Sequence, residues 1–141
     1  MDGRRFYILT GFQTVAASAV FWFLATFKGP WNVQRYIGTV MVVVGISFIA
    51  VARYQLGRSF SVKAEAYKLV TTGLYSKIRN PIYVSGIVMI TGIVLILRRP
   101  EGVLVLIAVA VGQTFRARRE ARVLEAAFGD AYREYRRETW F

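Results

Sequence analysis

Four long apolar runs constrain this chain more than any other feature. They lie at residues 6–27, 36–52, 82–97 and 103–115. A helix needs about 20 apolar residues to cross the hydrocarbon core of a bilayer, so the first run is ample and the last two are short. With 141 residues, 55% of them hydrophobic, the chain has room for one domain and is too apolar for most soluble folds of its size.

We therefore predict an all-α membrane protein, with residues 1–141 as a single domain. The predicted transmembrane helices cover about residues 6–27, 36–54, 82–97 and 103–116. A charged stretch containing Pro and Gly, residues 98–102, separates the last two helices and predicts a tight hairpin turn. Residues 28–32 form a similar break after the first helix, with Trp31 placed as an interfacial aromatic residue.

The distribution of basic residues predicts the orientation. If the chain crosses four times, 15 of its 19 Lys and Arg residues fall on one side. Basic residues mark the cytoplasmic side, so both termini are expected in the cytoplasm and the protein is expected to be integral to the membrane. The net charge of +11 then reflects contact with membrane lipids, and no nucleic-acid partner is expected.

The absence of Cys and His removes several kinds of chemistry. No thiolate can act as nucleophile, and the commonest general base and metal ligand are both missing. A metal site would need carboxylates alone, of which there are eight. We expect no metal site.

Arg116 and Glu120 are the first candidate functional residues. Residues four apart share a helix face, and these two lie where the fourth helix leaves the hydrocarbon. They form either an ordinary surface ion pair or a paired cation and anion at the mouth of a membrane cavity. Nothing between residues 113 and 127 breaks this helix, and Gly129 is its expected stop.

The stretch from residue 68 to 83 is the second candidate. Gly73 permits a turn that exposes main-chain groups, and Pro81 biases Asn80 toward an extended backbone. These are the parts of a ligand-binding loop. They are equally the parts of a plain loop that leads into a helix, with its tyrosines as interfacial aromatics.

Five sequence motifs that resemble those of a known family follow one another along the chain. They are Leu56-Gly57-Arg58-Ser59, Leu69-Val70-Thr71-Thr72-Gly73-Leu74-Tyr75, Arg79-Asn80-Pro81-Ile82-Tyr83, Arg116 with Glu120 and Leu124, and Phe128-Gly129-Asp130-Ala131-Tyr132 with Tyr135. Together they resemble the isoprenylcysteine carboxyl methyltransferase family and its phospholipid methyltransferase relatives. The resemblance implies a membrane methyltransferase that takes S-adenosylmethionine from the cytoplasm and a lipophilic acceptor from the bilayer.

The resemblance also implies a site built from two segments, at about residues 56–83 and 116–135. The implied cofactor contacts are Tyr67, Lys68, Leu69, Val70, Tyr75, Asn80, Pro81, Ile82, Tyr83 and Glu120. Arg116 would face the acceptor, and Arg116 and Glu120 would be the catalytic pair.

Four positions depart from the family pattern. The family often has His where Tyr67 and Asn80 stand, Gly where Ser85 stands, and a second acidic residue where Ala121 stands. The amide of Asn80 can still donate and accept hydrogen bonds. Asn at this position is expected among bacterial members, which suggests a bacterial inner membrane as the location.

Chemistry favours a carboxylate as acceptor, because it arrives ionised and a His is not needed to deprotonate it. Arg116 would hold it, as the resemblance to isoprenylcysteine carboxyl O-methyltransferases implies. The alternatives are a phospholipid-amine N-methyltransferase, an NADPH-dependent sterol-type reductase and a non-catalytic lipid-binding membrane subunit. The oligomeric state stays open, since small residues such as Gly38 and Gly45 could pack helices within one chain or between two.

Overall fold

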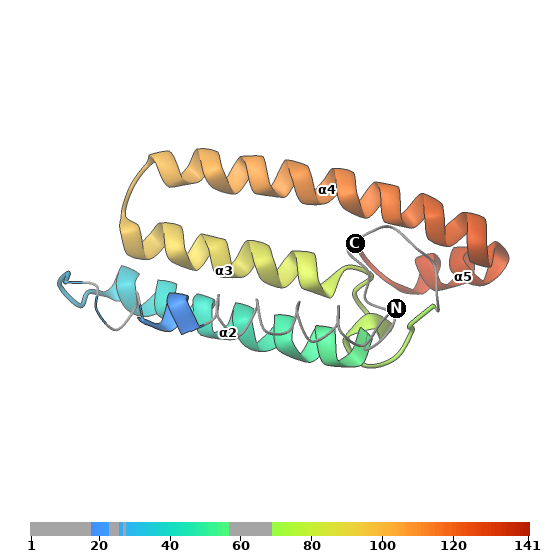
Figure 1. Ribbon diagram of the computed structural model, residues 1–141, viewed down its shortest axis with the longest axis horizontal. Helices are drawn as coiled ribbons and strands as arrows, with labels where there is room; N and C mark the ends of the chain where they lie inside the picture. The colour runs from blue at the N-terminus through green and yellow to red at the C-terminus, as the bar shows by residue number, and fades with distance from the viewer. Residues whose placement is uncertain (1–17, 23–25, 27, 57–68) are drawn as a thin grey trace.

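The computed structural model describes residues 18–22, 26, 28–56 and 69–141 (Figure 1). Its helices are α2 (Val33–Leu56), the short 3-10 helix η2 (Gly73–Ser76), α3 (Pro81–Leu97), α4 (Glu101–Phe128) and α5 (Asp130–Glu138). Within these residues every regular element is a helix, and a single β-bridge joins Ile78 to Trp140. The predicted all-α class is confirmed for the described part of the chain.

The predicted helix positions match the structure closely in three cases. The runs predicted at 36–54 and 82–97 are α2 and α3. The run predicted at 103–116 is the first half of α4, which continues to Phe128 as the unbroken sequence after residue 113 predicts. The helix predicted at 6–27 lies mostly outside the described residues, of which 18–22 and 26 are helical.

Four membrane crossings are not confirmed. Among the described helices, α2 alone is long and apolar enough to cross a bilayer, while α3 is apolar but has 17 residues. The first half of α4 is apolar and largely exposed, whereas its second half carries Arg116 and the charges that follow. The coarser prediction, a helical chain with a membrane-spanning segment, is the one the structure supports.

Small residues bring α2 and α3 into close contact. The buried residues Gly38, Val42 and Gly45 form a stripe along α2 that faces α3. Opposite them, Gly92 lies against the Gly38 carbonyl, and Met89 lies against Gly45. A stripe of small residues lets two backbones approach closely, so the Gly38–Gly45 pattern packs helices within this chain.

Gly92→Ala should destabilise the protein. A Cβ at Gly92 would lie 2.5 Å from the Gly38 carbonyl oxygen, which belongs to the backbone and cannot rotate away. We expect a loss of about 1–3 kcal/mol, as is usual when atoms are added to a tightly packed contact. Thermal unfolding in detergent measures it, with Gly112→Ala as control because a Cβ there meets nothing within 4 Å. Equal stability of the two variants would contradict the close α2–α3 contact.

The hairpin between α3 and α4 brings together the two helix segments that carry candidate site residues, the start of α3 and the middle of α4. α3 ends at Leu97, Arg98 adopts a left-handed conformation (φ 53°), and α4 begins at Glu101. The predicted turn is confirmed at residues 98–100, whereas residues 101 and 102 already belong to α4. Because the two helices run antiparallel, the start of α3 lies beside the middle of α4 (Figure 1).

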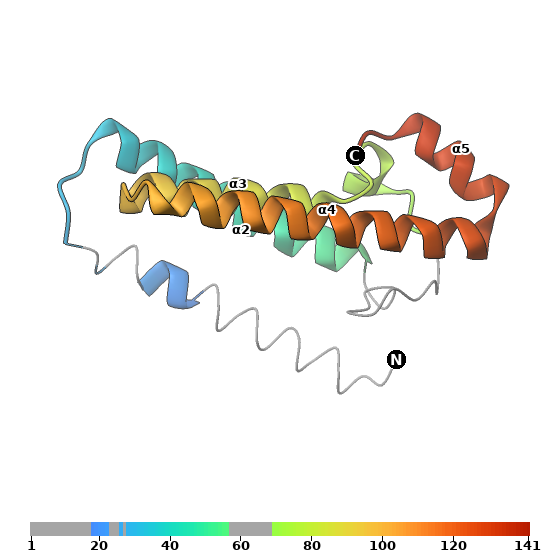
Figure 2. The same cartoon turned by 90° about the horizontal axis from the view of Figure 1, so that it is seen from above.

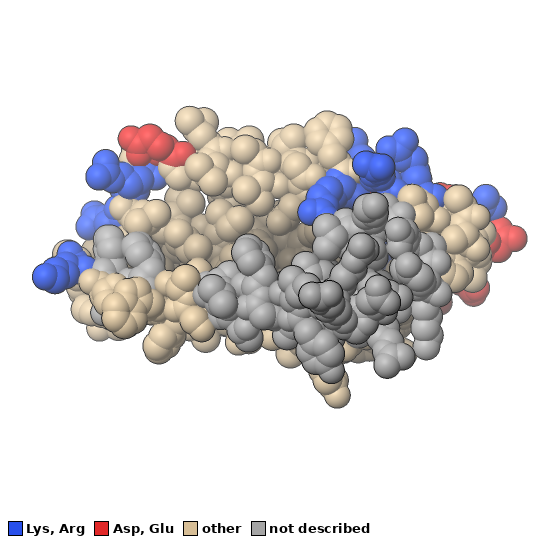
Figure 3. Space-filling model, viewed as in Figure 1, with Lys and Arg blue, Asp and Glu red and all other residues tan. Residues whose placement is uncertain are grey.

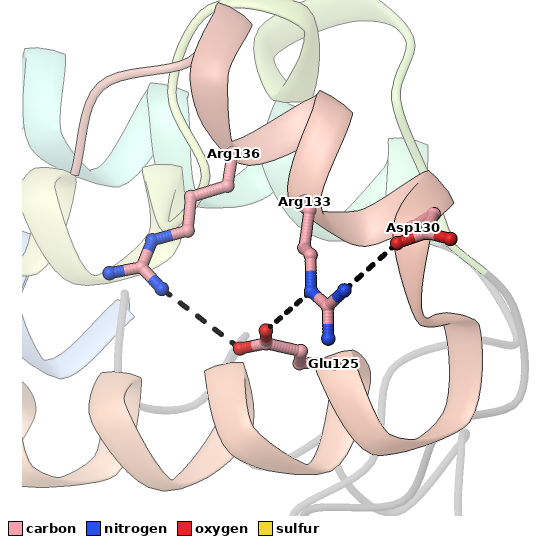
Figure 4. Close-up of polar contacts among 4 residues, drawn as sticks. All are labelled: Glu125, Asp130, Arg133 and Arg136. Atoms are coloured by element: carbon pink, nitrogen blue, oxygen red, sulfur yellow. Dashed lines mark hydrogen bonds and ion pairs between the residues drawn. The ribbon is translucent and has the colours of Figure 1, made fainter.

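A second turn folds α5 back toward the start of α3. Gly129 ends α4 with a positive φ of 53°, and its N–H donates to the Glu125 carbonyl at 2.9 Å, so the predicted stop is confirmed. Arg133 of α5 pairs with Glu125 at 3.0 Å and with Asp130 at 2.9 Å (Figure 4). These pairs are exposed and contribute little to stability, so the position of α5 depends on its buried face.

Candidate active site

Tyr83, Arg116 and Glu120 form the centre of the candidate site. The Tyr83 hydroxyl donates a hydrogen bond to Glu120 Oε1 at 2.5 Å, although the residues are 37 apart in the sequence. The Arg116 guanidinium, one turn earlier on α4, lies close enough for its charge to act on the Tyr83 hydroxyl. Tyr83 and Glu120 are half-buried, whereas Arg116 is exposed. The Tyr83 hydroxyl therefore links the start of α3 to Glu120 and lies near Arg116.

Tyr75, which belongs to the η2 turn, interacts with the residues of this centre. Its side chain is 6% exposed, and burial raises the pKa of its hydroxyl well above the ordinary value. The nearby Tyr135, Glu120 and Tyr83 raise this pKa further, so all three side chains lie close to it. Tyr75 is protonated at neutral pH and can donate a hydrogen bond but cannot act as a base.

Helix α5 contributes two buried tyrosines next to the η2 turn. Tyr132 and Tyr135 are both buried, and their ring centroids are 6.2 Å apart. Burial raises the pKa of Tyr135 to about 12. Burial also raises the pKa of Tyr132, whereas the charges of Arg79 and Arg136 lower it. The charge of Glu120 acts on tyrosine hydroxyls of η2, α3 and α5.

The η2 turn is held in place by Gln55 at the end of α2. The Leu74 N–H donates to Gln55 Oε1 at 2.7 Å. Gly73 has a φ of 64°, and a Cβ there would lie 2.5 Å from the Gln55 side-chain amide. Glycine is therefore required at residue 73 for two reasons, its backbone conformation and the space taken by Gln55.

Gly73→Ala should loosen the η2 turn. The left-handed backbone costs a residue with a Cβ about 1–2 kcal/mol, and the contact with Gln55 adds to this cost. Amide hydrogen exchange at residues 74–78 should accelerate. Gly112→Ala is the control, because φ is not positive there and nothing lies within 4 Å of the added Cβ. Unchanged exchange at residues 74–78 in Gly73→Ala would contradict the requirement for glycine in this turn.

The predicted site residues of the first segment are placed as follows. Leu69 and Val70 lie half-buried ahead of η2, and Tyr67 and Lys68 lie outside the described residues. Asn80 precedes α3, Pro81 begins it as a fully buried residue, and half-buried Ile82 follows. Of the predicted cofactor contacts, the structure thus brings Tyr75, Tyr83 and Glu120 together.

Three of the positions that depart from the family pattern lie within the described residues. Ser85 is buried, and its hydroxyl donates to the Pro81 carbonyl at 2.7 Å, so this polar group is satisfied within α3. Ala121 is half-buried and follows Glu120 on α4. Asn80 has a φ of −123° and a ψ of 59°, so its backbone is not in the extended region that the following proline was expected to favour.

The sequence did not reveal the pairing between residues 77–80 and residues 140–141. The Trp140 N–H donates to the Lys77 carbonyl at 3.1 Å, the Arg79 N–H to the Trp140 carbonyl at 3.3 Å, and the Asn80 N–H to the Phe141 carbonyl at 3.0 Å. The Tyr135 hydroxyl donates to the Tyr75 carbonyl at 2.7 Å. The one available signal was Tyr135 in the last motif, which spacing alone could not connect to Tyr75.

Basic side chains gather around this end of the molecule. Figure 3 shows them over the second half of α4, with a smaller group at the opposite end near the α3–α4 hairpin. Arg118, Arg119 and Arg122 are all exposed. No group of three or more His, Cys, Asp or Glu residues that could hold a metal ion occurs in the part of the chain that the structure describes.

These features define a helical membrane protein with one polar site at the basic end of its apolar helices. Phospholipid methyltransferase is the family whose model matches the chain, over residues 33–131, from the start of α2 into α5. The chain belongs to this family of membrane-associated methyltransferases. No curated protein and no solved structure matches the chain.

Proposed function

We propose that this protein transfers a methyl group from S-adenosylmethionine to a lipophilic acceptor at the cytoplasmic face of a membrane. Membership of a methyltransferase family supports the class of reaction. The observation that carries the proposal is the Tyr83 hydroxyl, which donates a hydrogen bond to Glu120 and lies within reach of the charge of Arg116. It places a carboxylate and a guanidinium side by side, where one can attract a cationic donor and the other an anionic acceptor.

The residues around Glu120 fit S-adenosylmethionine chemically. Bound there, it would supply a methyl group on a cationic sulfur: an ionised acceptor would bond to the methyl carbon as the carbon–sulfur bond breaks, and the sulfur would leave as a neutral thioether. A carboxylate among aromatic rings attracts a cation by charge and by cation–π contact. The residues proposed to hold it are Leu69, Val70, Tyr75, Asn80, Pro81, Ile82, Tyr83 and Glu120, with Tyr67 and Lys68 of the preceding segment.

Arg116 is the proposed acceptor-binding residue. It is exposed and lies where the apolar half of α4 ends, so it is open to a lipid headgroup at the membrane boundary. A guanidinium can hold a carboxylate through two parallel hydrogen bonds. A carboxylate acceptor loses no proton during transfer, and we therefore propose O-methylation of a lipophilic carboxylate.

Methylation of a phospholipid amine is the second candidate, because the matching family is described as phospholipid methyltransferase. An amine must lose a proton before or during transfer. Tyr75 cannot accept it, since burial keeps its hydroxyl protonated. Glu120 is then the available group, although one of its oxygens already accepts the Tyr83 hydrogen bond.

Calorimetry on the purified protein separates methyl transfer from its rivals. We expect binding heat with S-adenosylmethionine and none with NADPH. Heat with NADPH alone would support a sterol-type reductase, and heat with neither would support a non-catalytic lipid-binding subunit.

Transfer of a labelled methyl group then identifies the acceptor class. Incubation with a prenyl-chain carboxylic acid should give a labelled ester, from which alkali releases labelled methanol. Label that resists alkali, on a phospholipid with an amine headgroup, would instead establish N-methylation.

We also propose that the site faces the cytoplasm and that both termini lie on that side of a bacterial inner membrane. The uneven distribution of Lys and Arg supports this orientation, because basic residues are retained on the cytoplasmic side.

A further inference from the structure

Residues 132–141, here called the strap, lie beyond the residues that match the family and contact the candidate cofactor segment. Four hydrogen bonds join the strap to residues 75–80. One is from the Tyr135 hydroxyl to the Tyr75 carbonyl, and three are between backbone groups of residues 140–141 and those of Lys77, Arg79 and Asn80. Figure 2 shows the end of the chain beside η2, with α5 turned back over the same end of the molecule.

The strap is held by buried groups. Tyr132, Tyr135 and Thr139 are 3%, 7% and 8% exposed, and the Thr139 hydroxyl donates to the Tyr135 carbonyl at 2.7 Å where the chain leaves α5. Trp140, in contrast, is 60% exposed. Trp140 therefore joins the cofactor segment through its backbone, and its ring contributes little.

Gln55 holds the same segment from the other side. Its side chain binds the Leu74 N–H, while the strap binds the carbonyls of Tyr75 and Lys77 and the N–H groups of Arg79 and Asn80. Gln55 and the strap thus hydrogen-bond five backbone groups of residues 74–80. A ligand at this segment would be recognised mainly by side chains, and the backbone bonds set where those side chains point.

We propose that the strap is a positioning element of the cofactor site, with Tyr135 as a positioning residue that acts through Tyr75. This inference rests on the proposed function, because it assigns the strap to the binding of S-adenosylmethionine. A segment that is ordered before binding costs less to immobilise when the ligand binds. If the strap is loosened, the fraction of protein with a competent site falls, and the apparent affinity falls by the same factor.

Two substitutions loosen the strap and keep every residue that is proposed to contact the cofactor or the acceptor. Tyr135→Phe deletes one hydroxyl and keeps the ring. Trp140→Pro deletes the N–H that binds the Lys77 carbonyl, and the extended backbone of Thr139 (φ −120°, ψ 146°) suits a following proline.

Each substitution has a matched control. Trp140→Ala removes the exposed ring but keeps the N–H. Tyr54→Phe removes a hydroxyl from a side chain that is 89% exposed. Thermal unfolding of the full chain in detergent establishes that every variant is folded.

The readouts are the KM for S-adenosylmethionine, the kcat, the KM for the acceptor and amide hydrogen exchange at residues 74–80. We expect Tyr135→Phe and Trp140→Pro to raise the KM for S-adenosylmethionine about fivefold to tenfold, the range that one hydrogen bond commonly contributes. The kcat and the acceptor KM should stay near wild type, exchange at residues 74–80 should accelerate, and both controls should behave as wild type.

Wild-type KM and wild-type exchange in Tyr135→Phe and Trp140→Pro would overturn the proposal. A parallel fall of kcat in all four variants would also overturn it, because that pattern indicates general destabilisation. Failure of the wild-type protein to bind S-adenosylmethionine would refute the proposed function, whereas the exchange measurement would still report whether the strap orders the segment.

Discussion

Arg116→Ala should abolish methyl transfer while leaving the binding of S-adenosylmethionine largely intact. Arg116 is exposed at the end of the apolar half of α4, next to the Tyr83 hydroxyl, where an acceptor headgroup can reach it. Loss of a charged group that orients a reacting partner commonly lowers the rate by about a hundredfold to a thousandfold. The kcat/KM for the acceptor measures the loss, and calorimetry measures cofactor binding.

Arg122→Ala is the control for Arg116→Ala, because it removes the same charge from an exposed position on the same helix. It should stay near wild type. Arg116→Lys should lie between the two, since lysine keeps the charge but cannot make the paired hydrogen bonds of a guanidinium. Equal loss of acceptor turnover and cofactor affinity in Arg116→Ala would assign Arg116 to the cofactor site instead.

Glu120→Gln should weaken the binding of S-adenosylmethionine by about tenfold to a hundredfold, the size of effect expected for a lost charge-assisted contact. Gln keeps the shape and can still accept the Tyr83 hydrogen bond, so the variant removes mainly the negative charge. That charge acts on the hydroxyls of Tyr75, Tyr83 and Tyr132 together. Calorimetry measures the affinity, and thermal unfolding should change little.

Glu125→Gln is the matched control on the same helix. Glu125 pairs with Arg133 and Arg136 of α5, which places its carboxylate among exposed charges (Figure 4). Its loss should leave cofactor affinity near wild type. If Glu120→Gln and Glu125→Gln bind S-adenosylmethionine equally well, the carboxylate at residue 120 does not recognise the cofactor.

Local features of the sequence predicted most of the helical framework. Apolar runs placed α2, α3 and the first half of α4, and Gly129 marked the end of α4, because these signals depend on residues near one another in the chain. The number of membrane crossings was less predictable. The apolar stretches of α3 and α4 are short, so length and hydropathy alone do not establish that each one spans a bilayer.

The candidate site was predictable only in part. The spacing of Arg116 and Glu120 placed them on one helix face, and the resemblance to a known family connected them with Tyr75 and Tyr83. Neither argument could predict the hydrogen bond from Tyr83 to Glu120, since that contact depends on how the α3–α4 hairpin aligns the two helices. The role of Gln55 could not be predicted, because it depends on a contact with Gly73, which is 18 residues away.

The sequence by itself determined a helical membrane protein with its charge concentrated at one end, because hydropathy and helix signals act over short distances along the chain. Through its family motifs, the sequence also indicated the candidate site residues. The tertiary structure alone decided that Glu120 lies among tyrosines from three other elements and that residues 140–141 pair with residues 77–80. Hydrogen bonds between residues 37 to 63 positions apart form only when hairpins and turns bring them together, and no local pattern in the sequence encodes that alignment.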